Sequence, residues 1–117
     1  MDLQVRAVAK YIRMSPQKVK LVVDLVRGKQ VDEALTLLKY STKAAARPVA
    51  KVIRSAAANA EENYGLSPQE LYIAEIYADE GPTYKRGRFG ARGRFKPILK
   101  RSTHITVVLG GVEQAAR

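Results

Sequence analysis

A basic segment enclosed between two strand-like runs constrains the fold most. Residues 81–101 contain eight Lys or Arg residues and no Asp or Glu. The runs LYIAEIYADE before it and STHITVVLG after it have the β-branched, alternating character of strands. A structureless connection of about two dozen residues is uncommon in a compact domain unless it has a function. We therefore predict two antiparallel strands joined by a protruding arm, each leg of which could reach roughly 30 Å.

This arm also carries most of the positive charge. The formal net charge is +10, yet residues 1–80 contain twelve basic and ten acidic residues. Such a local positive field attracts a polyanion or an anionic membrane surface. Arginine pairs with phosphate, and the rings of Tyr84, Phe89 and Phe95 can stack on bases. Nucleic acid is therefore the first partner that the sequence predicts.

The rest of the chain predicts one α+β domain, in which three helices pack on a small antiparallel three-stranded sheet. Polar and apolar residues alternate from residue 3 to residue 12, which indicates a half-buried first strand. Its buried side is expected to carry Val5, Ala7, Ala9 and Tyr11. The other two strands are the runs 71–78 and 103–109 that flank the arm.

Local signals delimit the helices. Ser15 provides an N-cap oxygen and Pro16 a preset dihedral for the first helix, and Gly28 is expected to end it as a left-handed cap. A second, short helix begins near Asp32, where an acidic side chain suits the positive end of the dipole, and runs toward Tyr40.

The third helix is expected to be capped by Ser41 or Thr42 and stopped by Gly65. Pro48 should kink its first turns or mark a later start, because an interior proline removes a backbone donor. The domain is expected to span residues 1–117, with the arm at 79–101 and a flexible tail at 110–117.

Other classes of function find less support. His104 is the only histidine, and a structural role for it is favoured over catalysis. The acidic pairs are adjacent in sequence and do not converge, and no metal-ligand or phosphate-loop motif is present, so no enzyme, cofactor or metal is expected. A DNA-architectural or regulatory module remains an alternative, as does an RNA-dependent activity of His104 or Tyr84. Membrane-surface binding is disfavoured because glycines interrupt any amphipathic helix in the arm.

Several long stretches resemble one known family. They are RMSPQKVKLVVDLVRGK (13–29), ARPVAKVIRSAAANAEEN (46–63), GPTYKRGRFGARGRF (81–95) and ILKRSTHITVVL (98–109). Together they are similar to the universal large-subunit ribosomal protein family numbered twenty-two, of bacterial type. The resemblance implies a structural constituent of the large ribosomal subunit that binds rRNA, supports assembly and extends its hairpin to the wall of the nascent-peptide exit tunnel.

Candidate site residues follow from the charge pattern and from this resemblance. The expected rRNA-binding residues are Arg13, Lys18, Lys85, Arg86, Arg88, Arg92, Arg94, Lys96, Lys100 and Arg101. The resemblance places the tunnel-side tip of the hairpin at Tyr84, Lys85, Arg86, Phe89, Gly90, Ala91 and Arg92. A further basic set can be a contact surface or, slightly favoured, a plain solvated face: Lys39, Lys43, Arg47, Lys51 and Arg54.

The expected partners are large-subunit rRNA, neighbouring ribosomal proteins, the nascent peptide and macrolide antibiotics near the tunnel, with no membrane and no homo-oligomer. The chain contains no cysteine, which suits a reducing compartment. It also lacks a signal-peptide pattern. We therefore expect a cytoplasmic, ribosome-associated protein.

Overall fold

The computed structural model describes residues 4–89 and 95–111, and for 84–89 and 95–100 it describes the backbone. Gly90, Ala91, Arg92 and Arg94, all expected in the interface, lie outside these residues. The elements in chain order are β1 (Gln4–Ile12), α1 (Pro16–Val26), α2 (Val31–Lys39), α3 (Ala46–Tyr64), the 3₁₀ turn η1 (Pro68–Glu70), β2 (Leu71–Glu80), β3 (Tyr84–Phe89), β4 (Phe95–Lys100) and β5 (Thr103–Gly111).

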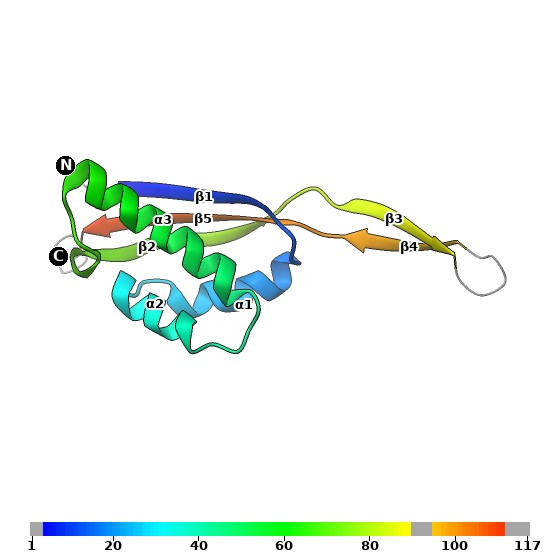
Figure 1. The fold of residues 1–117 in the computed structure, drawn as a ribbon, viewed down its shortest axis with the longest axis horizontal. Coiled ribbons are helices and arrows are strands. Elements are labelled where there is room, and N and C mark those ends of the chain that lie inside the picture. The colour runs from blue at the N-terminus through cyan, green and yellow to red at the C-terminus, as the bar shows by residue number, and fades with distance from the viewer. Residues whose placement is uncertain (1–3, 90–94, 112–117) are drawn as a thin grey trace.

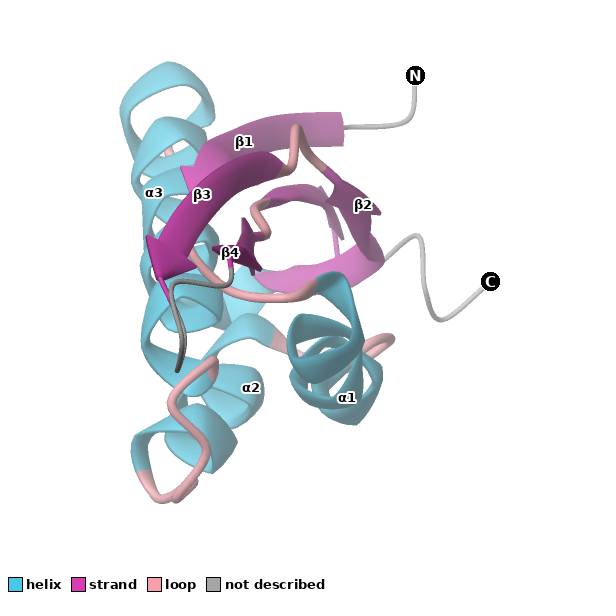
Figure 2. Ribbon diagram, turned by 90° about the vertical axis from the view of Figure 1, so that its right-hand side faces the viewer, coloured by secondary structure: helices cyan, strands magenta, loops and turns pink. Residues whose placement is uncertain are grey.

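The predicted α+β fold is confirmed. β5 is the central strand of a three-stranded antiparallel sheet and pairs with β1 on one side and β2 on the other. Leu109 of β5 lies opposite Val5 of β1 and Ile73 of β2. The three helices lie on one side of the curled sheet, and the β3–β4 hairpin extends away from them (Figures 1 and 2).

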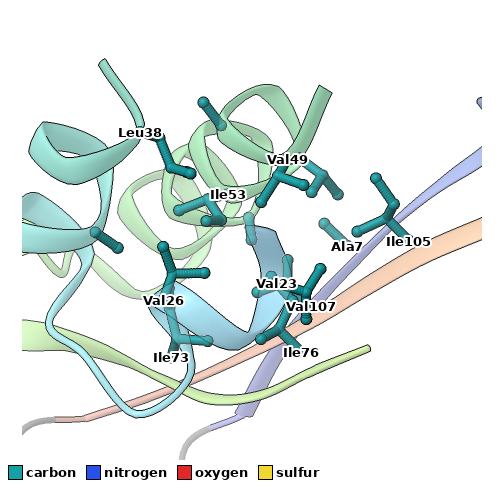
Figure 3. Close-up of a cluster of buried hydrophobic side chains, with 14 of the residues drawn as sticks. Ala7, Val23, Val26, Leu38, Val49, Ile53, Ile73, Ile76, Ile105 and Val107 are labelled. Carbon is teal, nitrogen blue, oxygen red and sulfur yellow. The ribbon is translucent and has the colours of Figure 1, made fainter. Parts of the chain in front are cut away.

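The core between sheet and helices is built from aliphatic side chains. Four isoleucines from three elements are at most 1% exposed to solvent: Ile53 of α3, Ile73 and Ile76 of β2, and Ile105 of β5 (Figure 3). α1 adds a stripe at helical spacing: Val19, Val22, Val23 and Val26. Compact β-branched residues lose little side-chain entropy on burial, so a core without tryptophan can still close tightly.

The end of β1 departs from the predicted alternation. Tyr11 was expected on the buried side, but it is 58% exposed and has φ +59°. The register of β1 against β5 shifts between the pair Ala9–Ile105 and the next pair, Ile12–Thr103. The cause is Tyr11, because a residue with positive φ cannot continue the pleat of a strand. The Tyr11 N–H donates to Nδ1 of His104 at 3.0 Å, and the two rings meet edge to face.

The predicted helix caps are partly wrong. Ser15 does precede α1 in an extended conformation and Pro16 is its first residue, but the Ser15 side chain makes no capping hydrogen bond. α3 is not capped by Ser41 or Thr42, since its N-cap residue is Ala45. The Ser41 hydroxyl instead accepts the Lys43 N–H at 3.2 Å, so it orders the loop before the helix.

Of the two outcomes expected at Pro48, a kink or a later helix start, the structure shows the later start. The helix begins at Ala46, so Pro48 occupies its third position. The first four N–H groups of a helix have no intrahelical partner, so the proline there removes no helical hydrogen bond. Gly65 ends α3 with φ +66°, which confirms the predicted left-handed cap.

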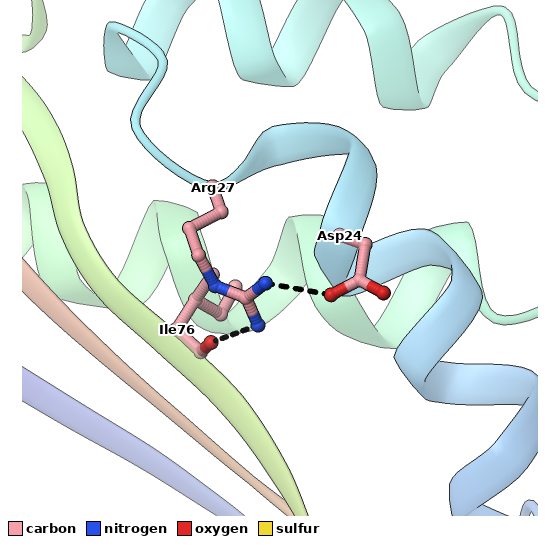
Figure 4. Close-up of polar contacts among 3 residues, drawn as sticks. All are labelled: Asp24, Arg27 and Ile76. Atoms are coloured by element: carbon pink, nitrogen blue, oxygen red, sulfur yellow. Dashed lines mark hydrogen bonds and ion pairs between the residues drawn. The ribbon is translucent and has the colours of Figure 1, made fainter.

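The connection between α1 and α2 covers the outer edge of β2. α1 ends at Val26, and Gly28 follows with φ +82°. The Gly28 N–H donates to the carbonyl of Ile73 at 3.1 Å, and the Ile73 N–H donates to the carbonyl of Lys29 at 2.8 Å. Arg27 donates to the Ile76 carbonyl at 3.0 Å and pairs with Asp24 at 2.7 Å (Figure 4). These contacts satisfy edge groups that could otherwise pair with another chain.

Candidate nucleic-acid interface

The arm is a two-stranded antiparallel ribbon. β3 and β4 pair from Tyr84 opposite Lys100 to Phe89 opposite Phe95, and they belong to a sheet of their own. The molecule measures 63 × 26 × 23 Å, and the arm accounts for its elongation (Figure 1). An isolated hairpin is marginally stable in water, and this one carries many like charges, so an anionic partner would stabilise it.

The strand register sorts the arm positions onto two faces. Alternate residues of a strand share a face, and directly paired residues share one too. One face therefore holds the positions Tyr84, Arg86, Arg88, Lys96, Ile98 and Lys100. The opposite face holds the positions Lys85, Gly87, Phe89, Phe95, Pro97 and Leu99. The first is predominantly basic and the second predominantly apolar, a division that the sequence order alone does not display.

The root of the arm is fixed by close polar contacts. The Gly81 N–H donates to the carbonyl of Ser102 at 2.9 Å, and the buried Ser102 hydroxyl donates to the carbonyl of Pro82 at 2.7 Å. A Cβ atom on Gly81 would lie 2.5 Å from the Ser102 Oγ, so glycine permits this approach. The two legs are thereby joined where they leave the domain. Sequence reasoning missed this role of Ser102, although the Gly-Pro turn opposite it was a signal.

Replacing Ser102 with alanine is expected to lower the free energy of unfolding by about 1–2 kcal/mol, because it removes the part-buried hydrogen bond from the Ser102 hydroxyl to the Pro82 carbonyl. Urea unfolding of the purified chain measures this change. Ser55→Ala, at an exposed position of α3, is the matched control and should change stability by less than about 0.5 kcal/mol. An effect of Ser102→Ala no larger than that of the control would contradict the assigned role.

The expected interface residues on the domain are exposed, and two of them lie at the root of the arm. Met14, which follows Arg13, accepts a hydrogen bond through its carbonyl from the Thr103 hydroxyl at 2.6 Å. Arg101 stands two residues before Thr103, so the same contact brings the segments of Arg13 and Arg101 together. Lys18 is exposed in the first turn of α1. The domain therefore adds cations beside the arm.

Features of other site classes are absent from the part of the chain that the structure describes. It contains no group of three or more His, Asp or Glu residues that could hold a metal ion. None of its helices is both long and apolar enough to cross a membrane. His104 accepts a backbone hydrogen bond from Tyr11 and packs against its ring, which gives this histidine a structural contact.

Comparison with known proteins gives one consistent answer. The family model described as ribosomal protein L22p/L17e matches residues 7–110. A relative named large ribosomal subunit protein uL22, from Clostridium novyi (strain NT), is 55% identical over 107 residues, which cover 92% of this chain and 96% of the relative. The protein of the same name from Clostridium acetobutylicum is 52% identical over the same shares of both chains.

Proposed function

The chain belongs to the ribosomal protein L22p/L17e family, and we propose that it binds large-subunit rRNA through its basic arm and the adjoining surface of its domain. It is a structural protein of the large ribosomal subunit, of the bacterial type. The observation that carries the proposal is the antiparallel ribbon of β3 and β4, a basic element that is rooted firmly in a folded domain.

The two-faced arm suits a crevice in folded RNA. Its basic face can neutralise phosphates from Arg86, Arg88, Lys96 and Lys100, while Arg13 and Arg101 extend the contact onto the domain. The apolar face can pack against bases, because aromatic rings stack on any base. Phosphate contacts of this kind fix position and orientation without reading sequence. RNA shape therefore selects the site.

The far end of the arm serves, in this proposal, as part of the wall of the nascent-peptide exit tunnel. The resemblance to the family assigns this tip to Tyr84, Lys85, Arg86 and Phe89, together with residues 90–92 outside the described part. In the ribbon, Phe89 pairs with Phe95 at the outer end, whereas Tyr84 pairs with Lys100 at the end nearer the domain, so Phe89 is the described residue that fits the tip. A ribbon of this length can reach well beyond the domain that anchors it. The nascent peptide and macrolide antibiotics would meet the arm there.

The remaining roles follow from membership of the ribosome. The protein supports assembly of the large subunit, contacts neighbouring ribosomal proteins and resides on ribosomes in the cytoplasm. It acts as a scaffold and performs no catalysis. In this proposal, the arm and the adjoining domain surface are the parts of the protein that bind RNA.

Deleting residues 84–96 tests the proposal directly. The deletion is expected to weaken binding to large-subunit rRNA at least about a hundredfold, because most of the basic arm is lost. Electrophoretic mobility shifts with a matched duplex DNA competitor measure both affinity and preference. The deletion removes β3 and the first two residues of β4, and these two strands pair only with each other, so the sheet of β1, β5 and β2 should persist. Circular dichroism checks this.

Two outcomes would count against the proposal. Equal affinity of the intact chain for duplex DNA and rRNA would indicate a general nucleic-acid module. Unchanged rRNA binding after the deletion would place the main RNA surface on the globular domain and leave the arm without its proposed role.

A further inference from the structure

The order of charged residues along α3 is unfavourable for the helix dipole. Its first turn contains Arg47 and no acidic residue, while its last turn contains Glu61 and Glu62 and no basic residue. The N-terminus of a helix carries a partial positive charge and the C-terminus a partial negative one. Cations at the start and anions at the end are therefore both unfavourable. α2 shows the opposite and favourable order, with Asp32 and Glu33 in its first turn and Lys39 in its last.

The basic side chains of α3 also repel one another. Arg47, Lys51 and Arg54 follow at intervals of four and three residues, so they form one stripe about 10 Å long on the helix surface. All three are exposed. Among the described side chains the ion pairs are Arg27 with Asp24 and Lys29 with Glu33, so no carboxylate neutralises the stripe. Like charges at this spacing destabilise a helix.

The position of the stripe fits an extended binding surface. The half of α3 that carries it lies nearer the arm than the half that carries Glu61 and Glu62 (Figure 1). The opposite face of the same half packs Val49, Val52 and Ile53 into the core, so the helix cannot turn the stripe away from solvent. A rigid element thus holds three exposed, uncompensated cations in the half of α3 that is nearer the arm.

We propose that the α3 stripe of Arg47, Lys51 and Arg54 is a second binding site for the phosphate backbone of rRNA, separate from the arm. This inference rests on the proposed function and names a surface for it that charge counting left as a solvated face. A charge order that weakens the free protein is retained where a partner supplies the missing counter-charge. Phosphates against the start of α3 would relieve both the mutual repulsion and the unfavourable dipole.

The test replaces all three cations in Arg47→Gln/Lys51→Gln/Arg54→Gln and measures two quantities on the intact chain. The affinity for large-subunit rRNA should fall about ten- to hundredfold, and the logarithmic salt slope should become shallower by about 2–3. The Tm of the free protein should rise by about 2 °C or more, because repulsion is removed. Opposite changes in affinity and stability separate a lost contact from a damaged fold.

Controls separate this site from other effects. Lys29→Gln removes one charge from a residue that is already paired with Glu33, and it should weaken rRNA binding less than Lys51→Gln does. Glu61→Gln/Glu62→Gln should raise the Tm without lowering affinity. The triple substitution should also reduce the residual rRNA binding of the chain that lacks residues 84–96.

The outcomes distinguish the two proposals. If the intact chain does not prefer rRNA to duplex DNA, the proposed function fails. If it does, but the triple variant binds rRNA within twofold of the unmodified chain, the α3 site alone is overturned, even where the variant loses contact with a neighbouring ribosomal protein. A fall in Tm of several degrees would also overturn it, because the stripe would then stabilise the free fold.

Discussion

Raising the monovalent salt concentration from about 50 to about 200 mM is expected to weaken binding of the intact chain to large-subunit rRNA by about 10³–10⁴-fold. If the eight basic residues of 81–101 each neutralise one phosphate, the released counterions give a logarithmic slope of about −5 to −7. Fluorescence anisotropy titrations at four or five salt concentrations measure this slope.

A variant that keeps the ribbon but loses charge provides the control. Gln at Arg86, Arg88, Lys96 and Lys100 should make the slope shallower by about 3–4, because each lost phosphate contact removes about one unit. A slope no steeper than about −2 for the intact chain would mean that the arm is solvated in the complex.

Ile53→Ala is expected to lower the free energy of unfolding by about 3–4 kcal/mol. Ile53 is fully buried on α3 among side chains from the other layers of the core, so its removal loses transfer free energy and leaves a cavity (Figure 3). Urea denaturation followed by circular dichroism measures the change. Domains of this size are stable by only about 5–15 kcal/mol, so much of the stability would be lost.

Leu25→Ala is the matched control for this substitution. It also truncates an aliphatic side chain on a helix, but Leu25 is 50% exposed, so the expected loss is below about 1 kcal/mol. A similar loss for both variants would show that the core is not centred where α3 meets the sheet.

Much of the fold could be predicted because its local and global signals agree. The valine stripe of α1 and the alternation in β2 and β5 specify which faces are buried. Gly65 marks the end of α3 because few other residues adopt its positive φ. The three-stranded sheet followed from the sequence because two of its strands flank the arm and must come together at its root.

The errors arose where tertiary contacts override local preference. Tyr11 continues an alternating pattern, yet its hydrogen bond to the distant His104 accompanies a left-handed turn of the backbone that the pattern cannot show. Ser41 and Thr42 are good capping residues, but the Ser41 hydroxyl accepts a hydrogen bond from Lys43 within the loop, and α3 begins only at Ala46. Residue type therefore indicates which residues could cap a helix, whereas tertiary packing determines where the helix begins.

The candidate site was predictable in composition but not in arrangement. Counting charges identifies the basic arm, while the division of its positions into a basic and an apolar face depends on the register that pairs Arg88 with Lys96 and Phe89 with Phe95. Whether a basic residue of α3 opposes the helix dipole likewise depends on where the helix begins. Arg47 opposes the dipole only because α3 starts at Ala46.

The central position of β5 has a consequence for synthesis of the chain on the ribosome. β1 and β2 pair only with β5 in this sheet, and β5 is the last of the described strands to be made. Neither edge strand has a partner strand until residues 103–111 emerge, so the sheet can close only after the whole arm has been synthesised. The basic arm is therefore synthesised before the domain that holds it can fold, and the newborn chain presents its polycation to cellular RNA while still unfolded.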